Sequence, residues 1–336
     1  LRLAVDALLT LNMPFSVIHE WDLARLPKEA TALIWPMAYA AKDESFAQVR
    51  DFVRNGGQLL FSGDVRYGYD RQANRLERLE QLGILSSTMP VPLTDDGPAA
   101  TKLVFSQDRK VAWLPGAFEL NNMKAPDAIR DAYRDFLDSQ STVKRLVLNI
   151  DDGTVLASYV PLRNGQALTV VNMSPERRTI VVPAQDGTPE IAVAVAGDRT
   201  AFVMLNRDGA VIAAAAQGNI SVADRQICHG EGDVAFVALD NIDLTGSQRI
   251  LCLPFATGNA TLNRQNDAAG LSGAIGEFRN AHWTELAPSP ATPAGKALTM
   301  NIDAVSAYDL RILAAAGEEQ RAIADLTTML LLKQTP

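Results

Sequence analysis

The segment 43–64, DESFAQVRDFVRNGGQLLFSGD, constrains the fold more than any other part of this chain. Its apolar residues recur at helical spacing, as Phe46, Val49, Phe52 and Val53. Asp43 is the expected N-cap, and Gly56 is expected to end the helix. The apolar run 58–61 predicts a buried strand, and the polar break at 62–64 predicts its carboxyl end. The segment therefore predicts one helix and strand of an α/β sheet.

Helical and strand patterns alternate along the first 148 residues. Residues 1–11 have helical spacing, 15–18 have the pattern of a short strand, and 31–35 predict a second buried strand. Further on, the expected strands are 103–105 and 111–114, and the expected helices are 76–83 and 126–137. Such alternation favours a parallel sheet with helices on both faces. We therefore expect a doubly wound α/β domain over residues 1–148.

The order of these elements raises an expectation about the chain before Leu1. A doubly wound domain normally begins with a strand, because right-handed crossovers need that strand to feed the first helix. The sequence shows no such strand before Leu1 and no initiator Met. We expect a longer polypeptide with a strand upstream, and a sheet that is open, or filled by an added segment, beside the first helix.

After residue 148 the pattern changes to short apolar runs separated by turn residues. The expected strands include 154–160, 166–172, 179–182, 191–195, 201–205, 211–215, 234–239, 249–253, 273–278 and 297–302. Runs of this length and spacing are typical of antiparallel sandwiches. We predict a β-sandwich over 149–218 and a second β-rich module over 219–336, which ends in a helix at 318–332.

The composition excludes several classes of partner. The formal charge is −8 in 336 residues, whereas nucleic acids and anionic membranes bind a clustered basic face. No apolar run approaches the roughly 20 residues that span a bilayer. We therefore expect neither a nucleic-acid partner nor a membrane partner. The compartment stays open.

One polar cluster follows the buried strand at 58–61. Ser62 and Asp64 lie where strands of a doubly wound fold deliver residues to a ligand, and Tyr67 and Tyr69 follow in the next loop. This edge is a candidate ligand site. The plainer interpretation, a capped turn with solvated tyrosines, is the favoured one.

A second polar cluster, His19, Glu20 and Asp22, follows the expected strand at 15–18. Glu20 and Asp22 are residue types that act as acid and base, and His19 is a type that shuttles protons. Nothing in the sequence brings the three together. A loop with no catalytic role is therefore the favoured interpretation.

Two features of the β-rich part also suggest chemistry. His229, Glu231 and Asp233 alternate, so an extended chain would place them on one face as metal ligands, but the glycines between them favour a loop. Trp283 is a candidate for stacking on a sugar ring. Core or edge packing is favoured for it, because one tryptophan makes no platform. We assign no metal and no cofactor.

Several mechanisms are excluded because their motifs are absent. The sequence has no Gly-x-Ser-x-Gly elbow, no Walker-type loop and no dinucleotide fingerprint. A cysteine nucleophile is not expected either, because Cys228 and Cys252 lie in the β-rich half, where we expect buried thiols and no disulfide. We assign no catalytic residue.

The first part of the chain resembles the amidotransferase-like, or trimerisation, domain of family 42 β-galactosidases and related bacterial glycoside hydrolases. The resemblance covers NMPFSVIHEWDL and the segment from Ala32 to Asp64. The matching hallmarks are Pro36 after an apolar strand, Asp43 at a helix start, and Val53 before the turn at Gly56 and Gly57. Downstream, NGQALTVVNMSPERRTIVVP is similar to the small β-sandwich of such enzymes, with Asn172 after an apolar strand.

The resemblance implies an accessory role. In these hydrolases the two catalytic carboxylates lie on an upstream barrel, while the amidotransferase-like domain is non-catalytic, joins subunits and closes over the neighbour's active site. This chain has no eightfold βα series, so no carboxylate pair is assigned. We expect a non-catalytic C-terminal region of a bacterial glycoside hydrolase, with an upstream catalytic barrel and copies of itself, as a homotrimer, for partners.

Two alternatives stay open. In the first, the chain is a stand-alone carbohydrate-binding or sensory module that holds a glycan at the edge from Ser62 to Tyr69 or at Trp283. In the second, it is an enzyme that uses the strand-edge groups His19, Glu20, Asp22 and Asp64.

Overall fold

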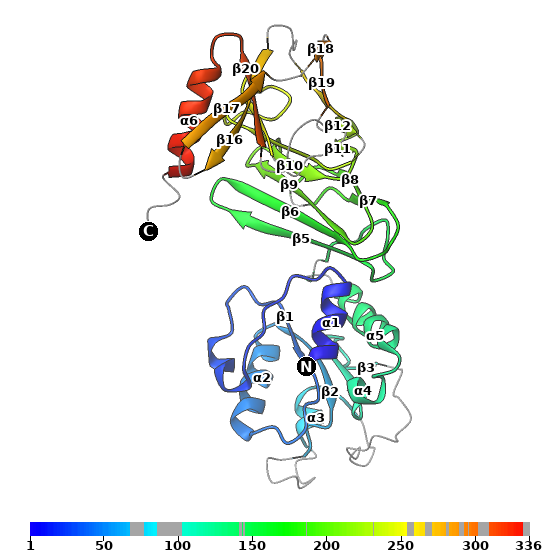
Figure 1. Cartoon of the computed structure of the whole chain (residues 1–336). Helices are drawn as coiled ribbons and strands as arrows, with labels where there is room; N and C mark the ends of the chain where they lie inside the picture. The colour runs from blue at the N-terminus through cyan, green and yellow to red at the C-terminus, as the bar shows by residue number, and fades with distance from the viewer. Residues whose placement is uncertain are drawn as a thin grey trace. The chain divides into compact units, whose positions relative to one another are not determined.

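The structure of the chain is a computed structural model with two compact units, Leu1–Arg145 and Leu146–Pro336 (Figure 1). The described residues are 1–67, 77–85, 103–140, 143, 145–185, 187–230, 232–253, 259–265, 271–279, 282–288, 292–294, 296–301 and 309–331.

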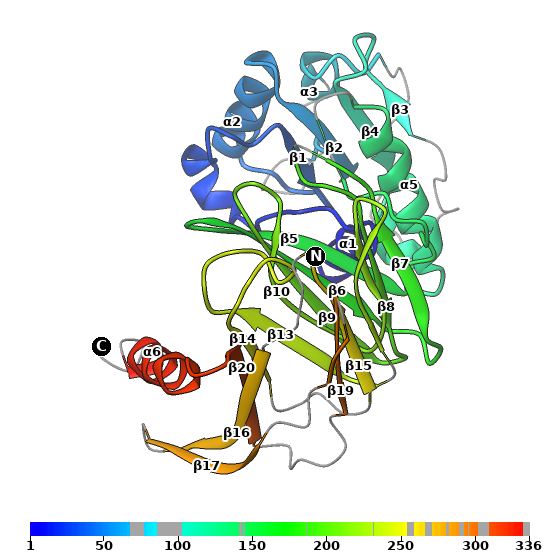
Figure 2. The same ribbon diagram turned by 90° about the horizontal axis from the view of Figure 1, so that it is seen from above.

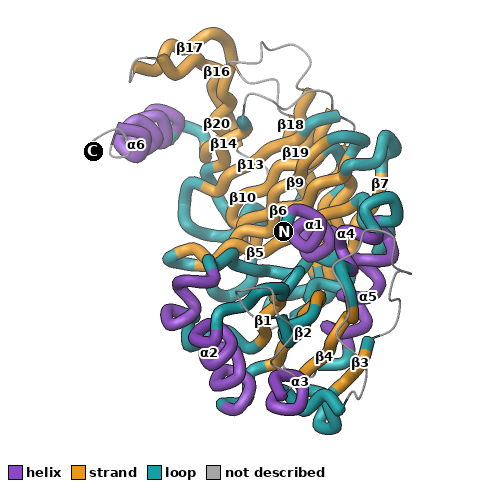
Figure 3. The backbone as a smooth tube through the Cα atoms, turned by 90° about the horizontal axis from the view of Figure 1, so that it is seen from below, coloured by secondary structure: helices purple, strands orange, loops and turns teal. Residues whose placement is uncertain are grey.

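The first unit contains a four-stranded sheet in the order β1-β2-β4-β3 (Figure 3). The strands are β1 (Ala32–Trp35), β2 (Gln58–Gly63), β3 (Val104–Phe105) and β4 (Val111–Pro115). β1, β2 and β4 run parallel, and β3 runs antiparallel to β4. All residues of β2 are buried, because it lies between two strands and is covered on both faces. The carboxyl ends of three parallel strands therefore meet at one edge.

Helices contribute apolar side chains to both faces of this sheet. They are α1 (Arg2–Thr10), the 3-10 helix η1 (Glu20–Arg25), α2 (Asp43–Arg54), α3 (Glu77–Gln81), α4 (Phe118–Asn121) and α5 (Pro126–Asp138). Alternate residues of a strand point to opposite faces. Leu60 and Ala112 accordingly pack in one core with α1 and α5, while Leu59 and Phe61 pack in another with α2 and α3.

Three local features differ from the sequence predictions. The N-cap of α2 is Lys42, and the carboxylate of Asp43 pairs with Arg78 instead, so the predicted cap is wrong. The strand predicted at 15–18 is also wrong: these residues are irregular, and among the described residues no backbone hydrogen bond joins them to a strand. Helix α4 was not predicted, because four residues are too few to show a helical period. The doubly wound assignment of residues 1–148 stays a prediction.

The predicted end of α2 is confirmed. Gly56 has a left-handed φ of +100°, a backbone conformation that glycine adopts without steric cost. The N–H of Gly57 donates to the carbonyl of Phe52 at 3.0 Å, which closes the last turn of the helix. The chain leaves this turn directly into β2.

The second unit consists of antiparallel strands in two sheets (Figure 2). The larger sheet has the order β17-β16-β20-β14-β13-β10-β9-β6-β5, and the smaller has the order β18-β19-β15-β12-β11-β8-β7. The strands of the larger sheet are β5 (Val155–Leu162), β6 (Gly165–Asn172), β9 (Arg199–Asn206), β10 (Val211–Ala216), β13 (Val234–Ala238), β14 (Ile250–Cys252), β16 (Leu271–Arg279), β17 (His282–Pro288) and β20 (Asp309–Ala315). Those of the smaller are β7 (Arg178–Val182), β8 (Ile191–Val195), β11 (Ile220–Val222), β12 (Arg225–Gly230), β15 (Asn259–Asn263), β18 (Thr292–Ala294) and β19 (Ala297–Asn301).

One apolar core joins the two sheets. Val203 and Phe236 from the larger sheet belong to the same buried cluster as Val193 and Cys228 from the smaller. The sheets therefore form a sandwich, and the predicted antiparallel β-sandwich architecture is confirmed. Both sheets draw strands from 149–218 and from 219–336, and the division into two modules at that point stays a prediction.

The last described helix, α6 (Glu319–Leu331), confirms the helix predicted at the carboxyl end. Its residues Ala322 and Leu326 share a buried cluster with Ile312 of β20. Cys228 and Cys252 are buried and free, as predicted. Within the described ranges, no helix has the length and apolar character needed to cross a membrane.

Candidate functional site

The carboxyl end of β2 carries the first predicted site residue, Ser62, which is buried. Its Oγ accepts a hydrogen bond from the backbone N–H of Met37 at 2.7 Å, and its carbonyl accepts one from Ala38 at 2.7 Å. Met37 and Ala40 have left-handed backbone, each with φ of +55°, which costs on the order of 1 kcal/mol for a residue with a side chain. The loop after β1 is thus held in a tight conformation over Ser62.

Gly63 is required at the next position because the chain packs too closely there for a side chain. Its φ is +92°, and a Cβ atom would lie 2.8 Å from the backbone nitrogen of Ala38. Its N–H donates to the carbonyl of Gly116 at 2.8 Å, and its carbonyl accepts a 2.7 Å hydrogen bond from Nε1 of Trp113. Glycine therefore lets β2, β4 and the loop after β1 converge.

A carboxylate that the sequence analysis missed meets Ser62 at this edge. Glu119 of α4 is only 3% exposed. Ser62 Oγ donates to its Oε2 at 2.5 Å, and the hydroxyl of Tyr133 on α5 donates to its Oε1 at 2.7 Å. Burial, together with the adjacent Glu119 carboxylate, raises the pKa of Tyr133 well above its ordinary value, so this hydroxyl remains a donor. The sequence signal that points to Glu119 is the Pro115-Gly116 break just before it, because this break marks the end of a neighbouring parallel strand.

Asp64, the next predicted site residue, forms a buried ion pair with Arg66. Its Oδ1 accepts from Arg66 Nε at 2.8 Å and from the Arg66 backbone N–H at 3.0 Å, while Oδ2 accepts from Nη2 at 2.9 Å. The side chains of Asp64 and Arg66 are 0% and 2% exposed. The guanidinium carbon lies 5.7 Å from the centre of the Trp113 ring. Two-point pairing of this kind compensates for the removal of both charges from water.

Two tyrosines border this cluster. The rings of Tyr39 and Tyr67 are 6.0 Å apart. The hydroxyl of Tyr39 is buried and has no hydrogen-bond partner among the described residues. Burial raises the pKa of Tyr39 well above its ordinary value, and the Asp64 carboxylate adds to the rise. Tyr67 lies beside Tyr39, and its backbone N–H donates to the carbonyl of Asp64 at 3.2 Å, whereas Tyr69 lies outside the described residues.

The second predicted cluster lies on η1 and does not join the first. His19 caps this helix by accepting the backbone N–H two residues on, and Asp22 forms an ion pair of 3.4 Å within the same helix. In the part of the chain that is described, neither Glu20 nor Asp22 has a hydrogen bond or ion pair with Ser62 or Asp64. The residues of the enzymatic alternative, which are His19, Glu20, Asp22 and Asp64, therefore share no side-chain hydrogen-bond network among the described residues.

In the second unit, Trp283 of β17 packs across Gly276 of β16. A Cβ atom at Gly276 would lie 2.3 Å from the indole ring, so the glycine makes room for it. Trp283 also packs against the buried cluster that contains Ile312. This placement agrees with edge packing more than with an exposed sugar platform. No group of three His, Cys, Asp or Glu side chains able to hold a metal occurs among the described residues, and Glu231 lies outside them.

The polar groups at this edge of the first unit are buried. Ser62, Asp64, Arg66 and Glu119 are each at most 3% exposed. A general acid or base must come within hydrogen-bond reach of its substrate. Each carboxylate here accepts hydrogen bonds from protein donors inside the core. The arrangement can hold β2, α4 and the loop after β1 together, and these described carboxylates do not face solvent.

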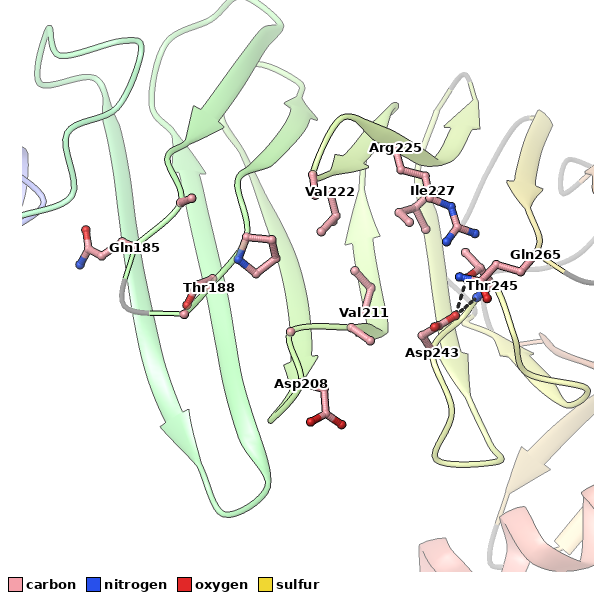
Figure 4. Close-up of a pocket in the computed structure, with 16 residues that line it drawn as sticks. Gln185, Thr188, Asp208, Val211, Val222, Arg225, Ile227, Asp243, Thr245 and Gln265 are labelled. Carbon is pink, nitrogen blue, oxygen red and sulfur yellow. Dashed lines mark hydrogen bonds between the residues drawn. The ribbon is translucent and has the colours of Figure 1, made fainter.

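The second unit has a groove of about 730 Å³ that the sequence analysis did not single out (Figure 4). Figure 4 shows Arg225, Asp243 and Gln265 near one end of this groove and Val211 and Val222 in its middle. Oδ1 of Asp243 accepts hydrogen bonds from two backbone N–H groups of its own loop, each at 2.8 Å. The guanidinium of Arg225 forms no ion pair with any described residue. The groove thus combines one open cation with an apolar wall.

No known family profile matches this chain, and no curated protein matches it. Among solved structures, Gan42B, a GH42 β-galactosidase from G. stearothermophilus, is 15% identical over 61% of this chain and 36% of that chain, with a TM-score of 0.44. A β-galactosidase from Bacillus circulans sp. alkalophilus is 15% identical over 60% of this chain and 36% of that one, with a TM-score of 0.39. α-L-Fucosidase isoenzyme 2 from Paenibacillus thiaminolyticus is 11% identical over 93% of this chain and 44% of that one, with a TM-score of 0.36. These similar structures are glycoside hydrolases, and this chain spans less than half the length of each.

Proposed function

We propose that this chain is a non-catalytic, carboxyl-side part of a bacterial glycoside hydrolase. Its first unit is a doubly wound, amidotransferase-like domain that joins subunits and shapes the substrate cleft of an upstream catalytic barrel. One observation carries the proposal: the polar groups at the carboxyl edge of β2 are buried and engaged with one another. The resemblance of the segment from Ala32 to Asp64 to the trimerisation domain of family 42 β-galactosidases supports it.

The buried edge supports an accessory role on chemical grounds. Doubly wound folds bind ligands outside the carboxyl ends of their parallel strands. In this chain the loop after β1 covers Ser62, and Asp64 and Glu119 are both withdrawn from solvent. Glycoside hydrolysis needs two carboxyl groups that face one bond, about 5 to 10 Å apart. Asp64 and Glu119 are instead bound to Arg66 and to hydroxyl donors.

The activity test uses the purified chain with nitrophenyl β-galactosides and nitrophenyl α-fucosides. We expect no turnover above that of buffer, because the described carboxylates at this edge, Asp64 and Glu119, do not face solvent. Glu20→Gln removes a partly exposed carboxylate of η1, and Glu44→Gln removes an exposed one on α2 as the matched control. Turnover that disappears with Glu20→Gln and persists with Glu44→Gln would overturn the accessory role and support the enzymatic alternative.

The assembly test is light scattering of the chain at micromolar concentration. Self-association of one chain type normally closes by rotational symmetry, and we expect a trimer. A specific interface buries on the order of 1,200 to 2,000 Å² in total, which makes it stable enough to detect in solution. A mass equal to one chain at every concentration would contradict the proposal that this part of the protein joins subunits.

The alternative of carbohydrate binding has one observation in its favour, the groove beside Arg225. An open guanidinium, amide groups and an apolar wall are the features that bind sugar hydroxyls and the C–H face of a ring. Calorimetric titration with galactose and fucose oligosaccharides tests this alternative. Binding that is lost with Arg225→Gln and kept with Arg207→Gln, an exposed arginine outside the groove, would favour a carbohydrate-binding module.

A further inference from the structure

Strand β1 leaves one row of backbone groups without a strand partner. The carbonyl of Thr31 accepts from the N–H of Gln58 of β2 at 2.9 Å, so the groups of Thr31 and Leu33 point toward β2. Because successive residues of a strand point their N–H and C=O groups to opposite sides, those of Ala32 and Ile34 point away from β2. In the described residues, no backbone hydrogen bond joins Ala32 or Ile34 to a segment on that side. An open strand edge of this kind is a template for another strand.

A groove of about 740 Å³ runs along this open edge. The irregular segment 15–18 also lines it. On one face of the sheet the groove is lined by Ala4 and Leu8 of α1, which belong to the core shared with α5. On the other face it is lined by Leu23 of η1, which belongs to the core shared with α2, and by Leu26, which packs against that core. The open edge thus has apolar walls both above and below the plane of the sheet.

The charged side chains that line the groove all have one sign among the described residues. Glu20 and Glu29 line it, and no described lysine or arginine does so. Neither carboxylate forms an ion pair with a described residue. A segment that carries basic residues beside its apolar part would therefore complement the groove in charge as well as in polarity.

We propose that this groove is a docking site for an extended peptide strand that pairs with β1. The strand supplies backbone groups to Ala32 and Ile34, carries apolar side chains on both of its faces, and has basic residues at its ends. Apolar residues on both faces are required because both walls are apolar, as for strands buried inside an α/β sheet. Recognition of this kind takes its affinity from main-chain hydrogen bonds and its specificity from side-chain pockets. The inference is independent of the proposed function.

The test is fluorescence anisotropy with the full chain and a labelled, end-blocked hexapeptide, Lys-Val-Ile-Val-Ile-Lys. We expect saturable binding with half-saturation below about 1 mM. A second peptide has the same side chains but N-methyl groups on its two central amides, which point to opposite sides of a strand. One of the two faces β1 in either register, so we expect this peptide to bind at least about tenfold more weakly.

Two variants on α1 form a matched pair. Val5 lines the groove and is only partly buried, whereas Leu9, one turn away, does not line it and is 44% exposed. We expect Val5→Glu to weaken peptide binding at least about tenfold by placing a charge against the apolar strand, and Leu9→Glu to leave it within about twofold. Circular dichroism checks that both variants keep the helix and strand content of the parent chain.

Three results would overturn the proposal. The first is the absence of saturable binding. The second is binding of the N-methylated peptide as tight as that of the unmethylated one, which would show that the groove binds apolar side chains without strand pairing. The third is a chain that elutes as a dimer and becomes a monomer with Val5→Glu and not with Leu9→Glu, because the groove would then be occupied by a second copy.

Discussion

Ser62 Oγ donates a hydrogen bond of 2.5 Å to Oε2 of Glu119, a residue 57 positions away in the sequence. The bond joins the end of β2 to the short helix α4, and Tyr133 extends it to α5. In folds that bind a ligand at this edge, the end of such a strand places its side chains beside the ligand. Here the Ser62 hydroxyl instead donates to a carboxylate of the same protein. This relationship underlies both the proposed accessory role and the first prediction.

Replacing Glu119 with Ala should destabilise the first unit by about 3 kcal/mol, because the buried hydroxyls of Ser62 and Tyr133 lose their shared acceptor. Glu119→Gln keeps an acceptor oxygen and should cost less. Urea unfolding followed by circular dichroism measures both changes. Glu80→Gln, at an exposed position of α3, is the control and should stay within about 0.5 kcal/mol. Equal stability of Glu119→Ala and the parent chain would contradict a supporting role for this network.

The Asp64–Arg66 pair should show strong coupling in a double-mutant cycle. Asp64→Asn and Arg66→Met each remove one half of a buried ion pair and should cost about 3 to 5 kcal/mol alone. The double variant should cost clearly less than the sum of the two, because the same ion pair is lost only once. The exposed Arg2–Asp6 pair is the control, with a coupling below about 1 kcal/mol. Additive losses at Asp64 and Arg66 would mean that the ion pair does not act as a unit.

Stability of the second unit should depend on pH through Asp152. The hydrogen bond from the Thr154 hydroxyl, with a further contribution from Arg178 and against partial burial, lowers the pKa of Asp152 to about 2. Because the pKa is lower in the folded state, the stabilisation is present above the ordinary value of 3.8 and is lost as the pH falls from there toward 2. The Asp152 side chain is 47% exposed, so the effect should stay below about 1 kcal/mol.

The measurement is the difference in urea midpoint between the parent chain and Asp152→Asn at pH 7 and near pH 2. We expect a difference at pH 7 that is much smaller near pH 2. Asp208→Asn, at an exposed turn of the same unit, controls for the general effect of removing a carboxylate. A difference that is unchanged between the two pH values would show that ionisation of Asp152, with its hydrogen bond from Thr154 and its ion pair with Arg178, adds no stability.

Cys228 and Cys252 should not react with thiol reagents in the native protein. Burial raises the pKa of each thiol to about 12, so at pH 8 about one thiol in ten thousand is a thiolate, and that group is shielded from reagents. Native chain should show negligible colour with a disulfide reagent at pH 8, and chain unfolded in guanidinium should show two thiols. Rapid labelling before unfolding would mean that the sandwich opens at β12 or β14.

The sequence by itself determined the local elements. Helical spacing before Gly56 predicts α2, and the apolar run after it predicts β2. Both patterns are local, because the period of a helix or a strand is set by its own backbone geometry. Short apolar runs with turn residues between them predict the antiparallel strands in the same way, including the alanine-rich strand β10. The strand expected upstream of Leu1 stays a prediction, while β1 does lie at an edge of its sheet, beside the groove that α1 lines.

Only the tertiary structure decided which side chains meet. Glu119 lies in a helix of four residues and carries no periodic signal, yet the end of β4 places it against Ser62. The chain at 15–18 has the residues of a strand but has no strand partner among the described residues, and a strand exists only through hydrogen bonds to another segment. Periodicity reports the nearest few residues, whereas the burial of a carboxylate or the pairing of an edge depends on chain segments that are distant in sequence and are brought together by packing.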